Sequence, residues 1–175
     1  MNRVVSGLML AWLALLTVSA EAAELDTKAI QDEIDQSVWR TFQRAFADLD
    51  GEALNTVYAN TVLRVTPEGG LDTQSRFKQT NRTRFAANIA NGDQIALDFW
   101  FDSRHTNRTT SYEVGFYRLG ITNAAGHVEH FYGQFHIVLS KIEGRWQIVQ
   151  DWDTDTIGGR AISASDFAQR SPARF

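Results

Sequence analysis

Residues 130–155 read HFYGQFHIVLSKIEGRWQIVQDWDTD, and this stretch decides the fold. Alternating apolar residues on both sides of Glu143-Gly144 predict two long antiparallel strands joined by a two-residue turn, because Gly in second place favours tight hairpins. If Ile142 faces Arg145, the register follows along both strands. It then pairs Leu139 with Ile148, Ile137 with Gln150, Phe135 with Trp152, His136 with Asp151, and Gln134 with Asp153. One face of the hairpin is therefore apolar, and the other carries a histidine and carboxylates.

Apolar residues spaced three and four apart predict helices ahead of this hairpin. We expect a long helix from residue 26 or 27 to about 49, a short helix capped by Asp50, and a third helix from residue 72 or 73 to about 90, with a short strand over 62–65 between the last two. Period-two alternation around 95–102 and 112–118 predicts two more strands. Three helices followed by a four-stranded meander make an α+β fold, with the helices on one face of a curved antiparallel sheet.

The first residues have the features of an export signal. Arg3 is followed by an apolar run from Leu8 to Val18, and the small residues at 18, 20 and 22 fit the cleavage rule. The apolar run is shorter than the roughly 20 residues of a membrane-spanning helix, although an uncleaved anchor is the alternative. We expect a signal peptide over 1–22, one domain over 24–157 and a polar tail over 158–175. The mature protein would be periplasmic or extracellular, with no membrane partner.

The composition excludes several classes of function. The chain has no Cys, which excludes thiol catalysis and Cys-ligated metals. A net charge of −4 argues against a nucleic-acid partner, because phosphate binding needs a basic face. No phosphate loop or dinucleotide fingerprint occurs, so we expect no cofactor. The four histidines lack ligand spacing, and the calcium-loop pattern that begins at Asp151 fails at Thr156 and Ile162, so we expect no metal site.

The predicted register provides one candidate catalytic pair, His136 and Asp151, with Glu113 on the next strand. A carboxylate that orients a neutral histidine holds it as a general base. The alternative is an outer sheet face with ordinary cross-strand charge pairs or a dimer contact. A bulge near Tyr132 or Asp151 would turn these polar groups inward instead.

Aromatic residues are abundant among the positions predicted to face inward. They form either a packed core or the lining of an apolar ligand site with a few polar groups. Our candidate ligand-binding residues are Tyr58, Arg64, Tyr112, Phe116, Arg118, Tyr132 and Trp152.

Two segments, FQRAFADLDGEALNTVYAN (residues 42–60) and YGQFHIVLSKIEGRWQIVQDWD (residues 132–153), resemble the nuclear transport factor 2-like superfamily, within it the SnoaL-like group and related bacterial secreted domains of unknown function. The resemblance covers about 130 residues and implies a cone-shaped barrel of cystatin-like topology. It does not imply one activity, because this fold hosts isomerases, cyclases, hydrolases, dehydratases and assembly domains. Thr66 and Phe42 stand where the steroid isomerases have their catalytic base and tyrosine, so that activity is not expected.

Three functions remain open at this stage. The first is binding of a small apolar molecule in the cone by a homodimer that associates through the sheet face. The second is an isomerase, cyclase or hydratase that uses the pair of His136 and Asp151, or Tyr132. The third is a homo-oligomeric assembly module without a pocket.

Overall fold

The computed structural model describes residues 26–175 of the chain, and the predicted leader lies outside them. No helix in that part of the chain is long and apolar enough to cross a membrane. Export and leader cleavage stay predictions.

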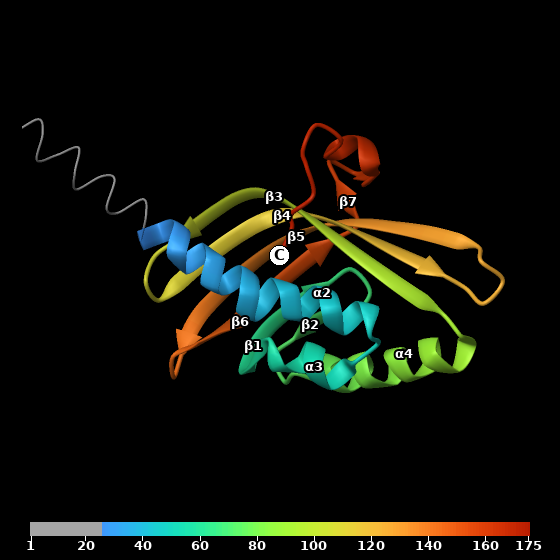
Figure 1. Ribbon diagram of the computed structural model, residues 1–175, viewed down its shortest axis with the longest axis horizontal. Helices are drawn as coiled ribbons and strands as arrows, with labels where there is room; N and C mark the ends of the chain where they lie inside the picture. The colour runs from blue at the N-terminus through green and yellow to red at the C-terminus, as the bar shows by residue number, and fades with distance from the viewer. Residues whose placement is uncertain (1–25) are drawn as a thin grey trace, which may run out of the picture.

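Helices occupy the positions expected from the sequence (Figure 1). Residues 26–47 form one continuous helix that contains a π-helical turn. The named helical elements are η1 (Asp35–Trp39), α2 (Arg40–Ala47), α3 (Gly51–Thr56) and α4 (Phe77–Asn91). The three predicted helical segments are confirmed, although α4 begins later than expected because strand β2 occupies Gly70–Asp72 and residues 73–76 form a bend and turn.

Short polar residues and one glycine set the helix ends. The Asp50 carboxylate accepts hydrogen bonds from the backbone N–H groups of Glu52 and Ala53 at 3.0 and 2.9 Å, as its predicted capping role requires. Gly92 ends α4 with a left-handed φ of 71°, a conformation that glycine adopts without strain.

Six strands form one curved sheet in the order β2-β1-β6-β5-β4-β3. They are β1 (Tyr58–Thr66), β2 (Gly70–Asp72), β3 (Gln94–Thr106), β4 (Thr110–Thr122), β5 (Val128–Ile142) and β6 (Arg145–Thr154). The predicted meander from β3 to β6 is antiparallel throughout. The α+β fold is therefore confirmed, and the sheet as a whole is mixed because β1 runs parallel to β6.

The hairpin register departs from the prediction part-way along. Ile142 faces Arg145 and Leu139 faces Ile148 as expected, but Val138 then faces Gln150, which leaves Val149 as an extra residue in β6. This bulge reverses the facing of every later β6 residue relative to the prediction. The predicted pairs beyond this point are wrong: Ile137 faces Asp151, His136 faces Trp152, Phe135 faces Asp153 and Gln134 faces Thr154.

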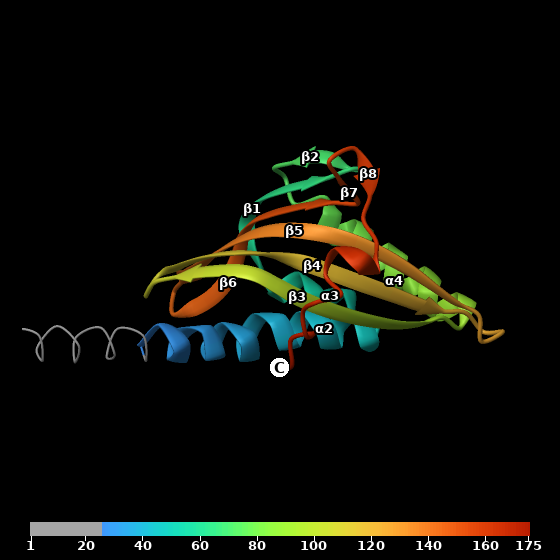
Figure 2. The same cartoon turned by 90° about the horizontal axis from the view of Figure 1, so that it is seen from above.

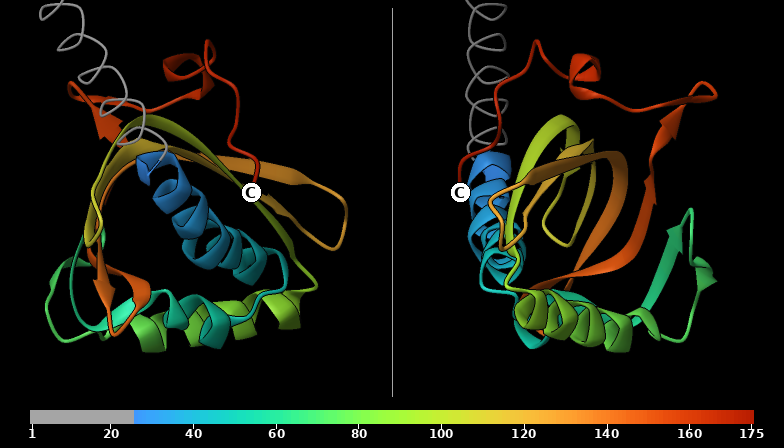
Figure 3. Two further views of the ribbon diagram at one scale, coloured as in Figure 1. Left: turned by 60° about the vertical axis from the view of Figure 1, so that its left-hand side comes forward. Right: turned by 90° about the vertical axis from the view of Figure 1, so that its right-hand side faces the viewer.

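The long helix lies along the concave side of the sheet, and α4 closes the lower end of the cone (Figures 2 and 3). Trp39, fully buried, forms ring contacts with Phe99 and Phe135 at centroid distances of 4.9 and 5.2 Å. The apolar face of the hairpin meets the helices as predicted, since Leu139 and Ile148 are fully buried in the same cluster.

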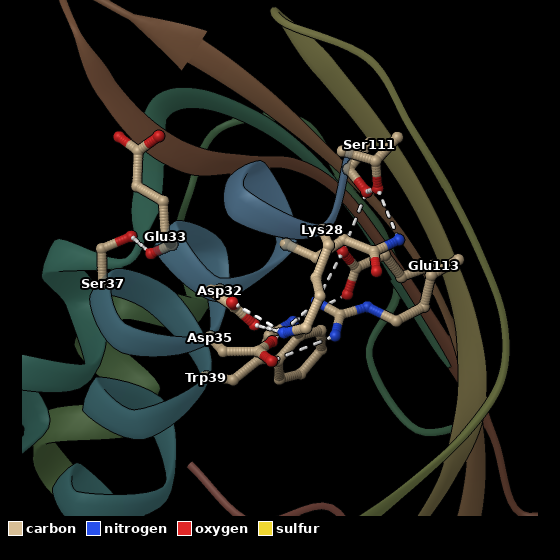
Figure 4. A network of polar contacts seen from close by, with 11 residues as sticks. Lys28, Asp32, Glu33, Asp35, Ser37, Trp39, Ser111 and Glu113 are labelled. Atoms are coloured by element: carbon tan, nitrogen blue, oxygen red, sulfur yellow. Dashed lines mark hydrogen bonds and ion pairs between the residues drawn. The ribbon is translucent and has the colours of Figure 1, made fainter. Parts of the chain in front are cut away.

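A buried carboxylate joins the helix to the sheet (Figure 4). Glu113 of β4 accepts hydrogen bonds from Trp39 Nε1 at 2.7 Å and Ser111 Oγ at 2.8 Å, and it pairs with Arg104 at 3.1 Å. Arg104 also pairs with Asp35 at 2.7 Å. Asp35 and Trp39 are the two ends of the π-helical turn, which therefore supplies both helix contacts of this network.

The C-terminal segment packs on the molecule rather than extending from it. Two short strands, β7 (Thr156–Ile157) and β8 (Arg160–Ala161), lead into a 3₁₀ turn, η2 (Ala164–Asp166). Phe167 then packs on Trp100 of the convex face, and the Phe175 ring lies 6.5 Å from Trp39 on the concave side. The segment thus passes around the edge of the sheet at β3.

Candidate functional site

A cavity of about 790 Å³ lies between the concave face of the sheet and the helices. Aromatic and aliphatic side chains form most of its wall: Trp39, Phe42, Phe46, Phe77, Leu97, Phe99, Leu119, Ile121, Phe131, Phe135 and Ile137. Its charged lining residues are Arg64, Glu68, Asp72, Arg76, Arg84, Asp151 and Asp153. A cavity of this size with a mainly apolar wall and polar groups at defined positions is typical of a small-molecule site.

The polar groups converge at the point where β1 and β6 lie side by side. Asp151 accepts a hydrogen bond from Tyr58 Oη at 2.8 Å and pairs with Arg64 at 2.6 Å. Arg64 reaches Asp153 as well, at 3.2 Å. The Val149 bulge produces this cluster, because it turns Asp151 and Asp153 toward the concave side instead of the outer face.

Asp153 is the titratable group of most interest in this cluster. Burial, aided by the neighbouring carboxylates of Asp151 and Glu68, raises its pKa to about 6 even though Arg64 opposes the shift. For Arg64, burial opposes the charge, but Asp151 and Asp153 outweigh it and hold its pKa above the usual value. A carboxyl group with such a pKa can both give and take a proton near neutral pH, as general acid–base chemistry requires.

Tyr117 of β4 adds a hydroxyl to the same cavity. Its cross-strand partner is Gly133 of β5, where an added Cβ would lie 2.4 Å from Tyr117 Cζ and Oη. The phenol ring therefore lies across β5 above the glycine, a position that any side chain there would block. Burial raises the pKa of Tyr117, and the carboxylate of Asp153 raises it further, so the hydroxyl stays protonated as a hydrogen-bond donor.

We predict that Gly133→Ala displaces the Tyr117 ring from β5. The end of a tyrosine side chain can move, so the expected loss of unfolding free energy is about 1–2 kcal/mol, in the range of overpacking. Urea denaturation measures the loss. Gly120→Ala is the comparison, since its φ lies outside the left-handed region and the nearest atom to the new Cβ belongs to the exposed His130 side chain, at 3.2 Å. A Tyr117→Ala, Gly133→Ala double variant as unstable as the sum of its singles would contradict a shared contact, because alanine removes the ring that the new Cβ would meet.

The structure separates the predicted catalytic pair. Asp151 lies inside the cone, whereas His136 lies on the convex face, where Tyr112 Oη contacts its Nδ1 at 2.6 Å and Trp152 packs on its ring at 4.9 Å. The prediction that His136 faces Asp151 is therefore wrong, and the cause is the bulge. Glu113, predicted to accompany them, is buried in the network of Figure 4.

The predicted ligand-binding residues divide between the two faces. Arg64 lines the cavity. Tyr58 is buried next to it, and the Tyr58 hydroxyl donates a hydrogen bond to Asp151, the residue that pairs with Arg64. The other candidates lie on the convex face, so the prediction that they line the cone is wrong. They are Tyr112 and Trp152 around His136, Phe116 and Tyr132 beneath Phe167, and Arg118 in an ion pair with Asp98.

Three residues that line the cavity were not predicted as site residues from the sequence: Asp153, Tyr117 and Arg84. The register of β4 against β5 places Tyr117 opposite Gly133. Knowing this register would have identified Tyr117, because the glycine leaves room for its ring. Asp153 could be found only by locating the bulge, because without it the alternation places this residue outside.

No protein-family model matches the chain, and no curated protein matches its sequence. Solved structures do match. A nuclear transport factor 2-like superfamily protein from Salmonella enterica has a TM-score of 0.58 at 14% identity over 78% of this chain and 99% of that one. A putative dehydratase of the same family from Streptomyces avermitilis has a TM-score of 0.59 at 10% identity, over 75% and 99%. The chain has the nuclear transport factor 2-like fold.

The same nuclear transport factor 2-like fold is found in proteins with different roles. The association domain of the C. elegans protein CaMKII matches with a TM-score of 0.57 at 19% identity, over 73% of this chain and 96% of that one. At such identities the likeness concerns the fold alone, so the function of this chain has to be argued from its own cavity. Among residues 26–175, no group of three or more His, Cys, Asp or Glu side chains is arranged to hold a metal ion.

Proposed function

We propose that this protein binds a small, largely apolar molecule inside the cone. The cavity carries the proposal: about 790 Å³ of space remains between aromatic walls, within the range of ligand pockets. Its polar groups gather at one end, where Tyr117 and Asp153 can orient a ligand. An assembly module without a pocket does not require such a space.

Fluorescence titration with phenylnaphthylamine, a neutral apolar dye, tests this proposal. We expect saturable binding to the wild type. Leu119→Trp narrows the cavity and should weaken binding at least tenfold, whereas Leu63→Trp, on an exposed residue outside the cavity, should leave binding unchanged. Absence of saturable binding, or equal binding by both variants, would contradict a ligand site in the cone.

A second candidate function is catalysis by proton transfer, and the raised pKa of Asp153 favours it. In this proposal Asp153 exchanges a proton with the bound molecule, and the Tyr117 hydroxyl donates a hydrogen bond to the oxygen that gains charge. Arg64 and Asp151 act as positioning residues, since each is held by the other at 2.6 Å. The activity would then lie in isomerisation, cyclisation or dehydration, reactions that need such a transfer. It would not use His136, which lies outside the cavity.

Homodimer formation through the sheet face is part of this proposal too. Residues around Phe167 cover the convex face at Trp100 and Phe116, so a second copy would meet the remaining area near Tyr112, His136 and Trp152. Light scattering on wild type and His136→Glu measures this: a monomeric wild type would exclude the dimer.

A further inference from the structure

Three arginine side chains line the cavity, and the structure pairs two of them. Arg64 contacts Asp151 and Asp153, and Arg76 lies 3.9 Å from Asp72. Within residues 26–175, Arg84 has no carboxylate oxygen within the 4.0 Å of an ion pair and donates no hydrogen bond to a side chain or carbonyl. Its charge is the one arginine charge of the cavity wall that the described protein leaves uncompensated at contact distance.

Aromatic rings hold this guanidinium in place. Its Cζ lies 5.6 Å from the centroid of Phe46 and 5.5 Å from that of Phe85, two rings that are buried in the core. Cation–π contact of this kind fixes the position of a guanidinium without using its N–H donors. Desolvation lowers the pKa of Arg84 and repulsion from Arg64 lowers it further, while Tyr58, Asp153 and Tyr117 partly oppose the shift.

No carboxylate of the cavity pairs with Arg84 at contact distance. Asp153 attracts it electrostatically, but the carboxylate oxygen of Asp153 lies 3.2 Å from Arg64 and forms its ion pair there. Asp151 is committed to Arg64 and Tyr58, and Asp72 faces Arg76. Glu68 is exposed in the turn between β1 and β2. Arg84 is an exposed residue of α4 that lines the cavity and keeps its N–H donors free of protein acceptors. Such a guanidinium can exchange water for an acidic group, whose planar, bidentate geometry it matches.

Resting on the proposed function, we propose that the ligand is an amphipathic organic acid. Its apolar body lies against the aromatic wall, and its carboxylate, or another acid group, binds Arg84. Arg84 is thus the residue that selects acids over neutral compounds of the same shape. A neutral ligand would leave the cation unpaired, which lowers its affinity relative to the acid.

Two dyes of nearly the same shape test this assignment. Anilinonaphthalene sulfonate and phenylnaphthylamine share their aromatic parts, and only the first carries an acid group. We expect Arg84→Gln to weaken the sulfonate dye about tenfold, the loss expected for a charge-assisted hydrogen bond, and to change the neutral dye less than twofold. Arg82→Gln is the matched control, because it removes the same charge from α4 at a residue that pairs with Glu52 and does not line the cavity.

The outcomes separate the two proposals. If both dyes bind and Arg84→Gln weakens them equally or not at all, the acid assignment is overturned while the ligand cavity stands. An equal effect of Arg82→Gln on the sulfonate dye also overturns it, because general charge then explains the change. If neither dye binds the wild type, the proposed function itself fails.

Discussion

Asp153→Asn is expected to make the protein more stable at pH 7, by about 2–3 kcal/mol, since a tenfold change in proton affinity corresponds to about 1.4 kcal/mol. The Asp153 side chain is 17% exposed, and its pKa in the folded state is raised to about 6. The folded protein therefore holds a proton that the unfolded chain releases from about pH 4 upward. Asparagine keeps the shape of the side chain and removes that penalty.

The pH dependence gives the sign of the effect. The stabilising contribution of protonated Asp153 is fully present below the unfolded pKa, and it is lost as pH rises through about 6. Urea unfolding should be measured at intervals from pH 4 to 8. The unfolding free energy of the variant should rise relative to that of the wild type between about pH 4 and 6, and the difference should then stay constant. Asp155→Asn, at an exposed residue, serves as the control and should change stability by less than about 0.5 kcal/mol. A destabilised Asp153→Asn would mean that the ion pair with Arg64 outweighs burial.

Glu113→Ala is expected to cost about 3–5 kcal/mol of unfolding free energy, the range for breaking a buried charge network. The Glu113 side chain is fully buried, and its loss leaves Trp39 Nε1 without its partner and Arg104 with Asp35 alone. Burial raises the pKa of Glu113 against the opposing effect of Arg104, so Glu113→Gln should lose less than Glu113→Ala.

Glu33→Ala, on the helix that Glu113 contacts through Trp39, provides the comparison. Glu33 pairs with Lys141 at 2.8 Å, with both side chains partly exposed, and its removal should cost less than about 1 kcal/mol. Thermal and urea unfolding of the two alanine variants measure the difference. Equal losses would show that the network of Figure 4 does not anchor the π-helical turn to the sheet.

The proposed function requires an Asp153 carboxyl group that lowers the stability of the folded protein. An ionised carboxyl group in an aromatic cavity destabilises the folded state, and proteins keep such groups where binding or catalysis needs them. The expected gain from Asp153→Asn and the expected loss of proton transfer in the same variant are two consequences of one arrangement.

The sequence predicted the architecture well because the signals are local. Helical spacing, the Asp50 cap and the Glu143-Gly144 turn each depend on a few neighbouring residues, and each is confirmed by the structure. The meander followed from alternation in the same way. The parallel pairing of β1 with β6 and the short strand β2 lie beyond what alternation alone predicts.

The site was harder to predict because one extra residue decides it. Side chains alternate along a strand, so the bulge at Val149 exchanges the faces of all later residues in β6. Asp151 and Asp153 therefore enter the cavity, and Trp152 joins His136 outside. The sequence allowed a bulge near Tyr132 or near Asp151, and the structure places it at Val149, two residues before Asp151. No residue there has a chemical signature that favours this position over Tyr132. The packing of the C-terminal segment on Phe116 could not be predicted either, because Ile162 and Phe167 are isolated apolar residues in a polar segment.

Direct titration of the Asp153 carboxyl carbon by NMR tests most sharply the claim that β6 delivers an acid into an apolar cavity. Spectra of Asp153→Asn assign the signal. The structure predicts a midpoint of about pH 6. A midpoint near the ordinary aspartate value of about 3.9 would contradict it, because burial would then not govern the carboxyl group and the cavity would lack an acid that exchanges a proton near neutral pH.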